Sequence, residues 1–168
     1  IKTILTLILI ITPITVYGNF LKLNTPAKQV ILYDHELKKI LFEKNSNDLM
    51  KPASMAKIMT AYIVFDRLQE GSLDLEDKFV ISKNAWKKGG SRTFLKLNSE
   101  VTISDLLMGL IVQSGNDAAI ALAEGIAGSE EDFAIQMNQY ADLLEMNNIY
   151  LPGTQKFLGY NYWGKATV

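Results

Sequence analysis

The sequence has no cysteine among its 168 residues and only one histidine, His35. Without cysteine the chain has neither a disulfide framework nor a thiol nucleophile. A histidine-rich metal site is excluded, and a Ser-His-Asp triad would need His35 as its base. His35 lies in a polar segment between two strand-like runs, where an exposed turn residue is the simpler interpretation. The net charge of −1, without a basic run, gives no support for nucleic-acid binding.

The sequence also lacks an apolar run long enough to span a membrane. Its apolar stretch at residues 4–11 follows Lys2 and is closed by Pro13, whereas a membrane-spanning helix needs about 20 apolar residues. The stretch fits the apolar part of a signal peptide, with cleavage near Gly18. A buried strand is the alternative. We expect residues 1–18 to be the signal peptide of an exported protein.

The first half of the mature chain predicts a hairpin followed by a helix. Runs rich in β-forming residues at 30–33 and 39–42 flank a polar segment, which is typical of a hairpin. A helical pattern then runs over residues 54–70, and Gly71 supplies the stop. Apolar residues lie around most of this helix, so we expect it to be buried.

The middle of the chain predicts two short strands and the start of a second helix. The strands are expected at residues 78–82 and 93–97, with a glycine-containing turn at residues 89–91 between them. Ser104 is a candidate N-cap for the helix that follows. Gly115 interrupts that helical pattern.

Two further helices are expected after Gly115. A helix of small residues at 118–127 is suited to close packing, and Gly128 ends it. Ser129 and Asp132 resemble a capping box, and an apolar helical face follows. The order of elements predicts an α+β fold in which a helical cluster packs against an antiparallel sheet.

The first motif that can carry chemistry is Ser54-Met55-Ala56-Lys57. Positions i and i+3 of a helix lie on one face, about 5–6 Å apart at Cβ. A serine hydroxyl needs an adjacent base to become a nucleophile, and a buried lysine can serve because burial disfavours its charged form. By itself the motif also fits a serine at a helix start beside a lysine whose amine reaches solvent.

The second motif is Ser114-Gly115-Asn116, between two predicted helices. From a loop, these residues can project into a cleft. The serine can relay a proton, and the asparagine offers a donor and an acceptor to an amide substrate. By themselves the three residues are also typical of a turn that links two helices.

Together, in this order and sixty residues apart, the two motifs resemble the S-x-x-K and S-D-N signatures of penicillin-binding proteins and class A β-lactamases. The sequence resembles the low-molecular-mass D-alanyl-D-alanine carboxypeptidases, the S11 group of serine peptidases, from about residue 27 to about residue 148. The matching stretches are 51–60, 89–91, 94–95, 105–107 and 114–119.

The resemblance implies a penicillin-binding/β-lactamase-like transpeptidase fold and a specific reaction. Ser54 would attack the carbonyl between the two D-alanines of a peptidoglycan stem peptide, and Lys57 would accept its proton. Ser114 would help to pass the proton, and Asn116 would hold the peptide amide. β-Lactams would acylate Ser54, and neither a cofactor nor a metal ion is expected. The implied location is the periplasm or the outer face of the cytoplasmic membrane, with peripheral inner-membrane association.

The sequence departs from the family toward its end. No Lys-Thr-Gly tripeptide follows Asn116, although the family places one on a strand well beyond that residue. We therefore expect residues 19–150 to be a partial catalytic domain without its C-terminal strands, and residues 151–168 to be a divergent tail. We also expect the chain to hydrolyse D-Ala-D-Ala poorly or not at all.

Two alternatives to an active carboxypeptidase follow from these departures. One is an inactive remnant that binds cell-wall peptide. The other is a class A β-lactamase, in which the middle residue of the second motif is usually aspartate. This chain has Gly115 there, which favours the carboxypeptidase.

Overall fold

The structure is a computed structural model that describes residues 23–48 and 50–146. The chain divides into two compact units, Ile1–Ser46 and Asn47–Val168. The predicted signal peptide and the predicted divergent tail lie outside the described residues. No helix in the described ranges combines the length and the apolar character needed to cross a membrane.

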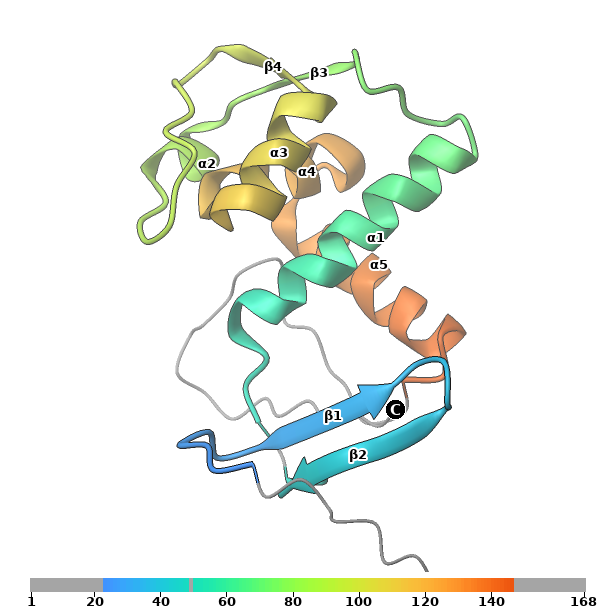
Figure 1. Ribbon diagram of the computed structural model, residues 1–168. Coiled ribbons are helices and arrows are strands. Elements are labelled where there is room, and N and C mark those ends of the chain that lie inside the picture. Colours follow the sequence, from blue (N-terminus) through green and yellow to red (C-terminus); the bar gives the residue numbers. More distant parts are fainter. Residues whose placement is uncertain (1–22, 49, 147–168) are drawn as a thin grey trace, which may run out of the picture. The chain divides into compact units, whose positions relative to one another are not determined.

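The first unit contains an antiparallel hairpin of β1 (Val30–Asp34) and β2 (Lys39–Lys44), labelled in Figure 1. The polar segment between the strands forms the turn, where Asp34 Oδ1 accepts a hydrogen bond from the Leu37 backbone N–H at 2.9 Å. The predicted hairpin is confirmed. His35 is exposed in this turn, with its Nε2 3.4 Å from Lys38 Nζ, as expected.

The second unit combines five α-helices with one antiparallel pair of short strands in its described part, which agrees with the predicted α+β class. Its elements are, in order, the 3₁₀ turn η1 (Ala53–Met55), α1 (Ala56–Gln69), β3 (Lys78–Val80), α2 (Lys83–Lys87), β4 (Glu100–Thr102), α3 (Ile103–Gln113), α4 (Asn116–Ala127) and α5 (Glu130–Leu143).

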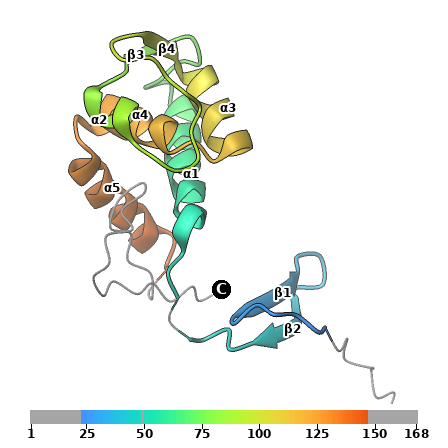
Figure 2. The ribbon, with the colours of Figure 1, turned by 90° about the vertical axis from the view of Figure 1, so that its left-hand side faces the viewer.

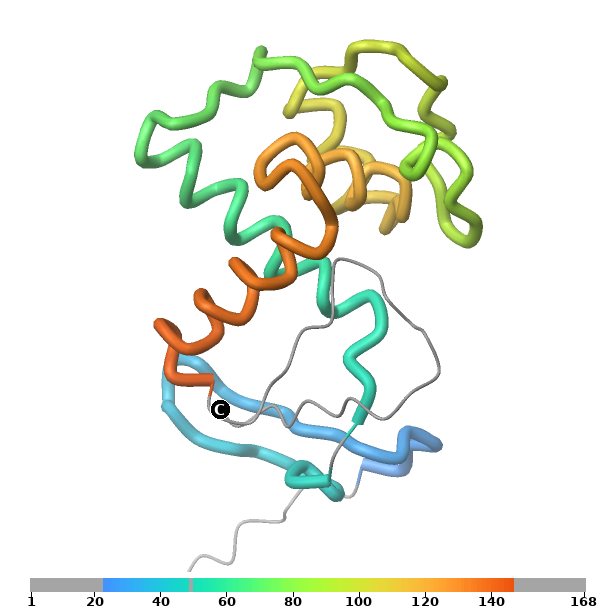
Figure 3. The backbone as a smooth tube through the Cα atoms, turned by 180° about the vertical axis from the view of Figure 1, so that it is seen from behind, coloured from blue at the N-terminus to red at the C-terminus, as the bar shows by residue number. Residues whose placement is uncertain are grey.

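Helix α4 lies at the centre of this unit. It contacts α1, α2, α3, α5 and β3, and every residue from Asp117 to Ala123 is buried. Alanine supplies four of these seven residues, and its small side chain lets neighbouring backbones approach closely. Figure 2 shows α3 beside α4, and Figure 3 shows α5, in orange to red, crossing α1 at an angle where the two helices contact each other. The prediction of a closely packed small-residue helix is confirmed.

Two apolar clusters hold the helices together. The larger one joins α3 and α4 to α1 and to the segment around β3, and its fully buried members include Val64, Ile81, Leu106 and Ile120. The smaller one lies between α1, α4 and α5, with Ile63, Phe133 and Met137 fully buried. Each large aliphatic or aromatic side chain buried in this way contributes about 1.5–3 kcal/mol. Helix α1 contributes to both clusters, which fixes its position in the unit.

The prediction that the first long helix is buried on nearly all sides is wrong. One side of α1 is buried, but Ile58 and Phe65 on the other side are 71% and 52% exposed. Met55 and Tyr62 on that side are also exposed. The sequence shows that apolar residues surround the helix, but it does not show which of them have a packing partner within the unit.

The strand predicted at residues 93–97 is also wrong. The backbone N–H groups of Thr93 and Leu95 donate to the Asp117 carboxylate, at 2.8 and 3.2 Å. They therefore do not enter a β-ladder. The partner of β3 lies further along the chain, where Lys78 pairs with Thr102 and Val80 with Glu100.

Several helix boundaries differ from the predicted ones, and the helix predicted over 54–70 begins as a 3₁₀ turn before α1. The short helix α2 was not expected; Ser82 caps it by accepting from the Ala85 N–H at 3.0 Å. Helix α3 begins two residues earlier than predicted, because Thr102 rather than Ser104 is the N-cap and accepts from the Asp105 N–H at 3.1 Å.

The end of α4 and the start of α5 agree with the sequence, whereas α4 begins at Asn116, two residues before the predicted start at 118. The break near Gly115 separates α3 from α4, and Gly128 ends α4 with φ +83°. Ser129 caps α5: its Oγ accepts from the Asp132 N–H at 2.9 Å and donates to the Asp132 carboxylate at 2.7 Å. The capping relation between Ser129 and Asp132 is confirmed.

Candidate active site

Ser54 and Lys57 lie at the start of helix α1. Ser54 is part of the 3₁₀ turn that leads into the helix, and Lys57 is the second residue of the helix. Lys57 Nζ donates a hydrogen bond to Ser54 Oγ at 3.3 Å. The spacing of three residues thus brings the two side chains together, as the sequence predicted.

The two side chains differ in their exposure to solvent. Ser54 is exposed, so its hydroxyl is accessible to a substrate. Lys57 is only 7% exposed. Burial, followed by the positive charge of Lys88, lowers the pKa of Lys57 from its ordinary value of 10.5. A lowered pKa increases the neutral fraction of the amine, and the neutral amine can accept the proton of the Ser54 hydroxyl.

Ser114 and Gly115 form the break between α3 and α4. Ser114 ends α3 in the left-handed conformation, with φ 52° and ψ 40°, and the Gly115 N–H donates to the Gly109 carbonyl at 3.0 Å. A Cβ at position 115 would lie 2.3 Å from Thr93 Oγ1. Position 115 therefore has no room for a side chain unless Thr93 moves.

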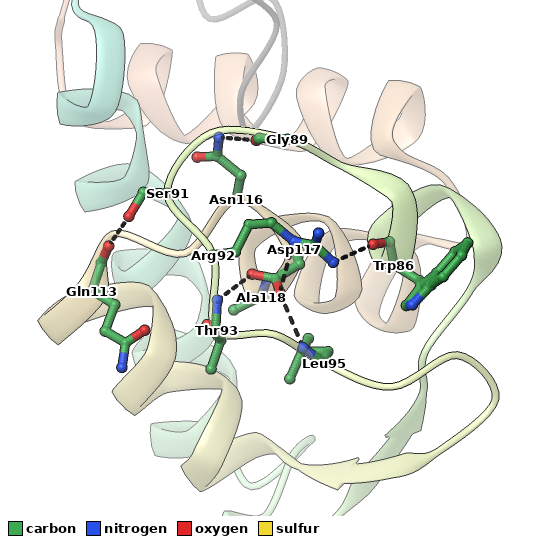
Figure 4. Close-up of polar contacts among 10 residues, drawn as sticks. All are labelled: Trp86, Gly89, Ser91, Arg92, Thr93, Leu95, Gln113, Asn116, Asp117 and Ala118. Carbon is green, nitrogen blue, oxygen red and sulfur yellow. Dashed lines mark hydrogen bonds and ion pairs between the residues drawn. The ribbon is translucent and has the colours of Figure 1, made fainter.

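Asn116, the first residue of α4, is held by the loop that follows α2. Its Nδ2 donates to the Gly89 carbonyl at 2.8 Å, and its backbone N–H donates to the Ser91 carbonyl at 2.8 Å. Gly90 has φ +84°, and a Cβ there would lie 2.6 Å from Asn116 Nδ2. Figure 4 shows the loop passing close to Asn116. These contacts fix the orientation of the Asn116 amide.

The buried carboxylate of Asp117 holds the same loop against α4. Asp117 is fully buried, and its carboxylate accepts from the N–H groups of Thr93 and Leu95 and lies 3.9 Å from Arg92 Nε. Figure 4 shows these partners converging on the start of α4, where the Ser91 hydroxyl also donates to the Gln113 carbonyl. Asp117 thus fixes residues 92–95 against α4, and the second motif lies next to this attachment.

The role of Asp117 was not predicted from the sequence. It appeared there only as one residue of a matching stretch, and a helix-start aspartate is ordinary in a sequence. Its partners lie 22 and 24 residues away along the chain, so no local pattern identifies them.

The loop after α2 carries residues that affect both motifs. The positive charge of Lys88 contributes to the lowered pKa of Lys57, and the next residue, Gly89, accepts the Asn116 hydrogen bond. No hydrogen bond joins Ser114 to Ser54 or Lys57 in the part of the chain that the structure describes. Ser54 and Lys57 are therefore in direct contact, whereas Asn116 is linked to them through this loop and Ser114 has no direct link.

The fold defines the class of protein to which this unit belongs. A D-alanyl-D-alanine carboxypeptidase DacD from Francisella tularensis superposes with a TM-score of 0.80 at 36% identity, covering 86% of this chain and 35% of that one. Penicillin-binding protein 5 from Haemophilus influenzae superposes with a TM-score of 0.78 at 33% identity, covering 86% of this chain and 44% of that one. The chain has the fold of the low-molecular-mass penicillin-binding proteins.

Sequence comparison specifies the family. The family model of peptidase S11, D-alanyl-D-alanine carboxypeptidase, matches residues 19–154. The chain is 42% identical over 122 residues to the D-alanyl-D-alanine carboxypeptidase DacF of Bacillus subtilis, which covers 73% of this chain and 31% of that protein. The chain belongs to the peptidase S11 family, and the predicted family is confirmed.

The match also covers only part of the relatives. The chain is 42% identical over 131 residues to DacC of Escherichia coli, covering 74% of this chain and 33% of that protein. It thus spans about a third of the length of these two curated relatives. The comparisons favour a carboxypeptidase over the β-lactamase alternative, in agreement with the lack of space for a side chain at position 115.

Proposed function

We propose that Ser54 and Lys57 are the nucleophile and general base of a serine-type D-alanyl-D-alanine carboxypeptidase. The observation that carries the proposal is the 3.3 Å contact between an exposed hydroxyl and a buried amine of lowered pKa. The substrate class comes from the names of the relatives, which are D-alanyl-D-alanine carboxypeptidases. β-Lactams are proposed as covalent inhibitors on the same grounds, since several structural neighbours are penicillin-binding proteins.

The proposed reaction forms and then hydrolyses an ester on Ser54. The Ser54 oxygen bonds to the carbonyl carbon between the two D-alanines while its proton passes to Lys57. The C–N bond breaks, and the leaving D-alanine nitrogen takes up that proton with Ser114 as the relay. Asn116 holds the peptide amide. Water then attacks the ester, which releases the shortened peptide and restores the Ser54 hydroxyl.

Mass spectrometry after incubation with a fluorescent penicillin tests the assignment of Ser54. We expect one adduct on wild type, none on Ser54→Ala, and an unchanged adduct on Ser72→Ala, which alters an exposed serine at the other end of α1. Lys57→Met should slow adduct formation by about 100-fold or more, because general bases contribute at least that much. No adduct on a wild-type chain shown to be folded by NMR would overturn the proposal.

We also propose that the protein acts outside the cytoplasm, in the periplasm or peripherally at the outer face of the cytoplasmic membrane. The proposal rests on the expected signal peptide at residues 1–18 and on the kind of substrate that the relatives' names state. Cell fractionation and N-terminal sequencing of the exported protein test it. A full-length product found only in the cytoplasm would contradict it.

A further inference from the structure

Arg92 contacts both ends of the loop that holds Asn116. Its Nη2 donates a hydrogen bond to the carbonyl of Trp86 in α2, and its Nε lies 3.9 Å from the Asp117 carboxylate in the first turn of α4. Figure 4 shows the Arg92 side chain extending between these two partners. The end of a helix leaves its last carbonyls without intrahelical partners, and Arg92 supplies a partner for that of Trp86.

The guanidinium group of Arg92 is itself held by its surroundings. Its Cζ lies 5.5 Å from the centroid of the Phe94 ring, which is within the range of a cation–π contact. At 3.9 Å the approach to Asp117 is a contact between charges rather than a hydrogen bond. A planar guanidinium can face three such groups at once, whereas an ammonium acts as a single point charge. One side chain therefore links α2, α4 and Phe94.

The loop between these two ends, residues 88–91, makes both of the contacts described above for Asn116. The Gly89 carbonyl accepts from Asn116 Nδ2 and the Ser91 carbonyl accepts from the Asn116 backbone N–H, each at 2.8 Å. Two consecutive glycines, Gly89 and Gly90, lie in this short loop, and glycine has more backbone freedom than any other residue. Fixing the two ends of such a loop limits the positions that the Gly89 carbonyl can adopt.

These contacts favour an indirect role for Arg92 over direct binding of an anionic substrate group. Its charge lies beside the fully buried Asp117 carboxylate, and one of its N–H groups is used by the Trp86 carbonyl. Its side chain is only 26% exposed. A residue placed in this way acts on a substrate through the groups that it holds.

We propose that Arg92 is a positioning residue for the reaction at this site. By holding both ends of residues 88–91, it keeps the Gly89 carbonyl in place, and this carbonyl orients the Asn116 amide toward an amide of the substrate. The proposal rests on the proposed function, in which Asn116 holds the peptide amide. It extends the site to a residue that does not touch the substrate.

Two β-lactams that differ in one amide test the proposal on the 168-residue chain. Benzylpenicillin carries a side-chain amide that Asn116 can hold, whereas 6-aminopenicillanic acid has the same fused rings without the acylated side chain. We expect Arg92→Met to slow formation of the Ser54 adduct with benzylpenicillin by about ten-fold, since small displacements of positioning groups are costly. The rate with 6-aminopenicillanic acid should stay nearly unchanged, as followed by mass spectrometry. Equal slowing of both reactions would mean that Arg92 only stabilises the unit, and that result or two unchanged rates would overturn the proposal.

Asn116→Ala tests the route by which Arg92 acts. This variant should show the same selective loss, and adding Arg92→Met to it should cause no further loss, because the effect of Arg92 passes through Asn116. Lys87→Met is the control, since it removes a positive charge from an exposed side chain next to Trp86, and it should change neither rate. Additive losses in the double variant would mean that Arg92 and Asn116 act independently, which contradicts the proposal.

Arg92→Lys is a second variant for the same assay. Arg92→Met takes the counter-charge from the buried Asp117 carboxylate, which is strongly destabilising, whereas a lysine keeps a cation near it. Because lysine lacks the forked guanidinium, the folded Arg92→Lys chain should show a smaller loss of the same selectivity. NMR of this variant should also show shifted or broadened resonances of the Asn116 side-chain amide. Unchanged resonances together with unchanged rates would overturn the proposal.

The wild-type chain separates this proposal from the assignment of Ser54. A wild type that forms the Ser54 adduct, with no selective effect of the Arg92 variants, retains the proposed function and loses the role of Arg92. A folded wild type that forms no adduct with either β-lactam overturns the proposed function and the role of Arg92 with it.

Discussion

The two motifs of the candidate site are held in place over very different distances along the chain. Ser54 and Lys57 are three residues apart, and the helix that begins there brings them into contact. Asn116 is held by Gly89, 27 residues away, and its neighbour Asp117 by residues 22 and 24 positions away. The first motif thus depends on local helix geometry. The second depends on a loop that is held in place by contacts between residues distant in the sequence.

This difference predicts different responses to mutation. A change in the first motif should alter chemistry with little effect on folding, because Ser54 is exposed. A change around the second motif should release the loop of residues 88–95 and destabilise the unit. The four predictions that follow test this contrast.

The largest effect is expected from Asp117→Ala. The substitution removes a fully buried carboxylate, leaves three backbone N–H groups without this acceptor and takes the ion-pair partner from Arg92. We expect the free energy of unfolding to fall by about 3–5 kcal/mol, as measured by urea denaturation. The control Asp105→Ala alters an exposed helix-start carboxylate and should cost about 0.5 kcal/mol. Similar losses for both variants would show that the loop is not held by Asp117.

Gly115→Ala tests the close approach of the loop to the second motif. The new Cβ would lie 2.3 Å from Thr93 Oγ1, so we expect a loss of about 1–3 kcal/mol in urea denaturation. Thr93→Ala in the same chain removes this contact and should recover part of the loss. Gly89→Ala is the control, since no atom lies within 4 Å of its added Cβ. If the stability changes of Gly115→Ala and Thr93→Ala simply add in the double variant, the close approach of the two positions does not cause the loss.

Tyr140→Phe tests how α1, which carries the first motif, is attached to α5. The Tyr140 hydroxyl donates to the Asp66 carboxylate, and its loss should cost about 1 kcal/mol near neutral pH. That hydrogen bond, with burial, raises the pKa of Tyr140 from 10.0 to about 12. The contribution to stability is therefore complete below about pH 10 and is lost as the pH rises through about 12.

Urea denaturation of wild type, Tyr140→Phe and Tyr62→Phe between pH 7 and pH 12 checks this prediction. Tyr62 packs edge-on against the Tyr140 ring, with the ring centroids 6.0 Å apart, and serves as the matched tyrosine. A difference between wild type and Tyr140→Phe that is the same at pH 12 as at pH 7 would show that the hydroxyl is not responsible.

The smallest effect is expected from Lys57→Met, which keeps an unbranched side chain and removes the amine together with its hydrogen bond to Ser54. Because the pKa of Lys57 is lowered in the folded state, the unfolded chain binds more protons between that pKa and 10.5. Stability therefore rises with pH across this window. Lys57→Met should be more stable than wild type at pH 7, and the advantage should shrink as the pH approaches 10.5. A destabilised Lys57→Met at pH 7 would mean that the charged amine has a stabilising partner.

The sequence was sufficient to predict the structure where the interacting residues are close together in the chain. The Ser54–Lys57 contact, the hairpin of β1 and β2 and the cap of α5 each involve residues close together in the chain. Their geometry follows from the repeat of a helix or the closure of a turn. The family was also accessible from the sequence, because several separate motifs occur in the right order.

Tertiary structure decided the features whose partners are distant. Residues 93–97 have strand-forming side chains, yet they form no strand because Asp117 takes two of their backbone N–H groups. The exposed side of α1 could not be predicted, because an apolar residue is buried only where another element packs on it. For the same reason the sequence does not show that the charge of Lys88 contributes to the lowered pKa of Lys57.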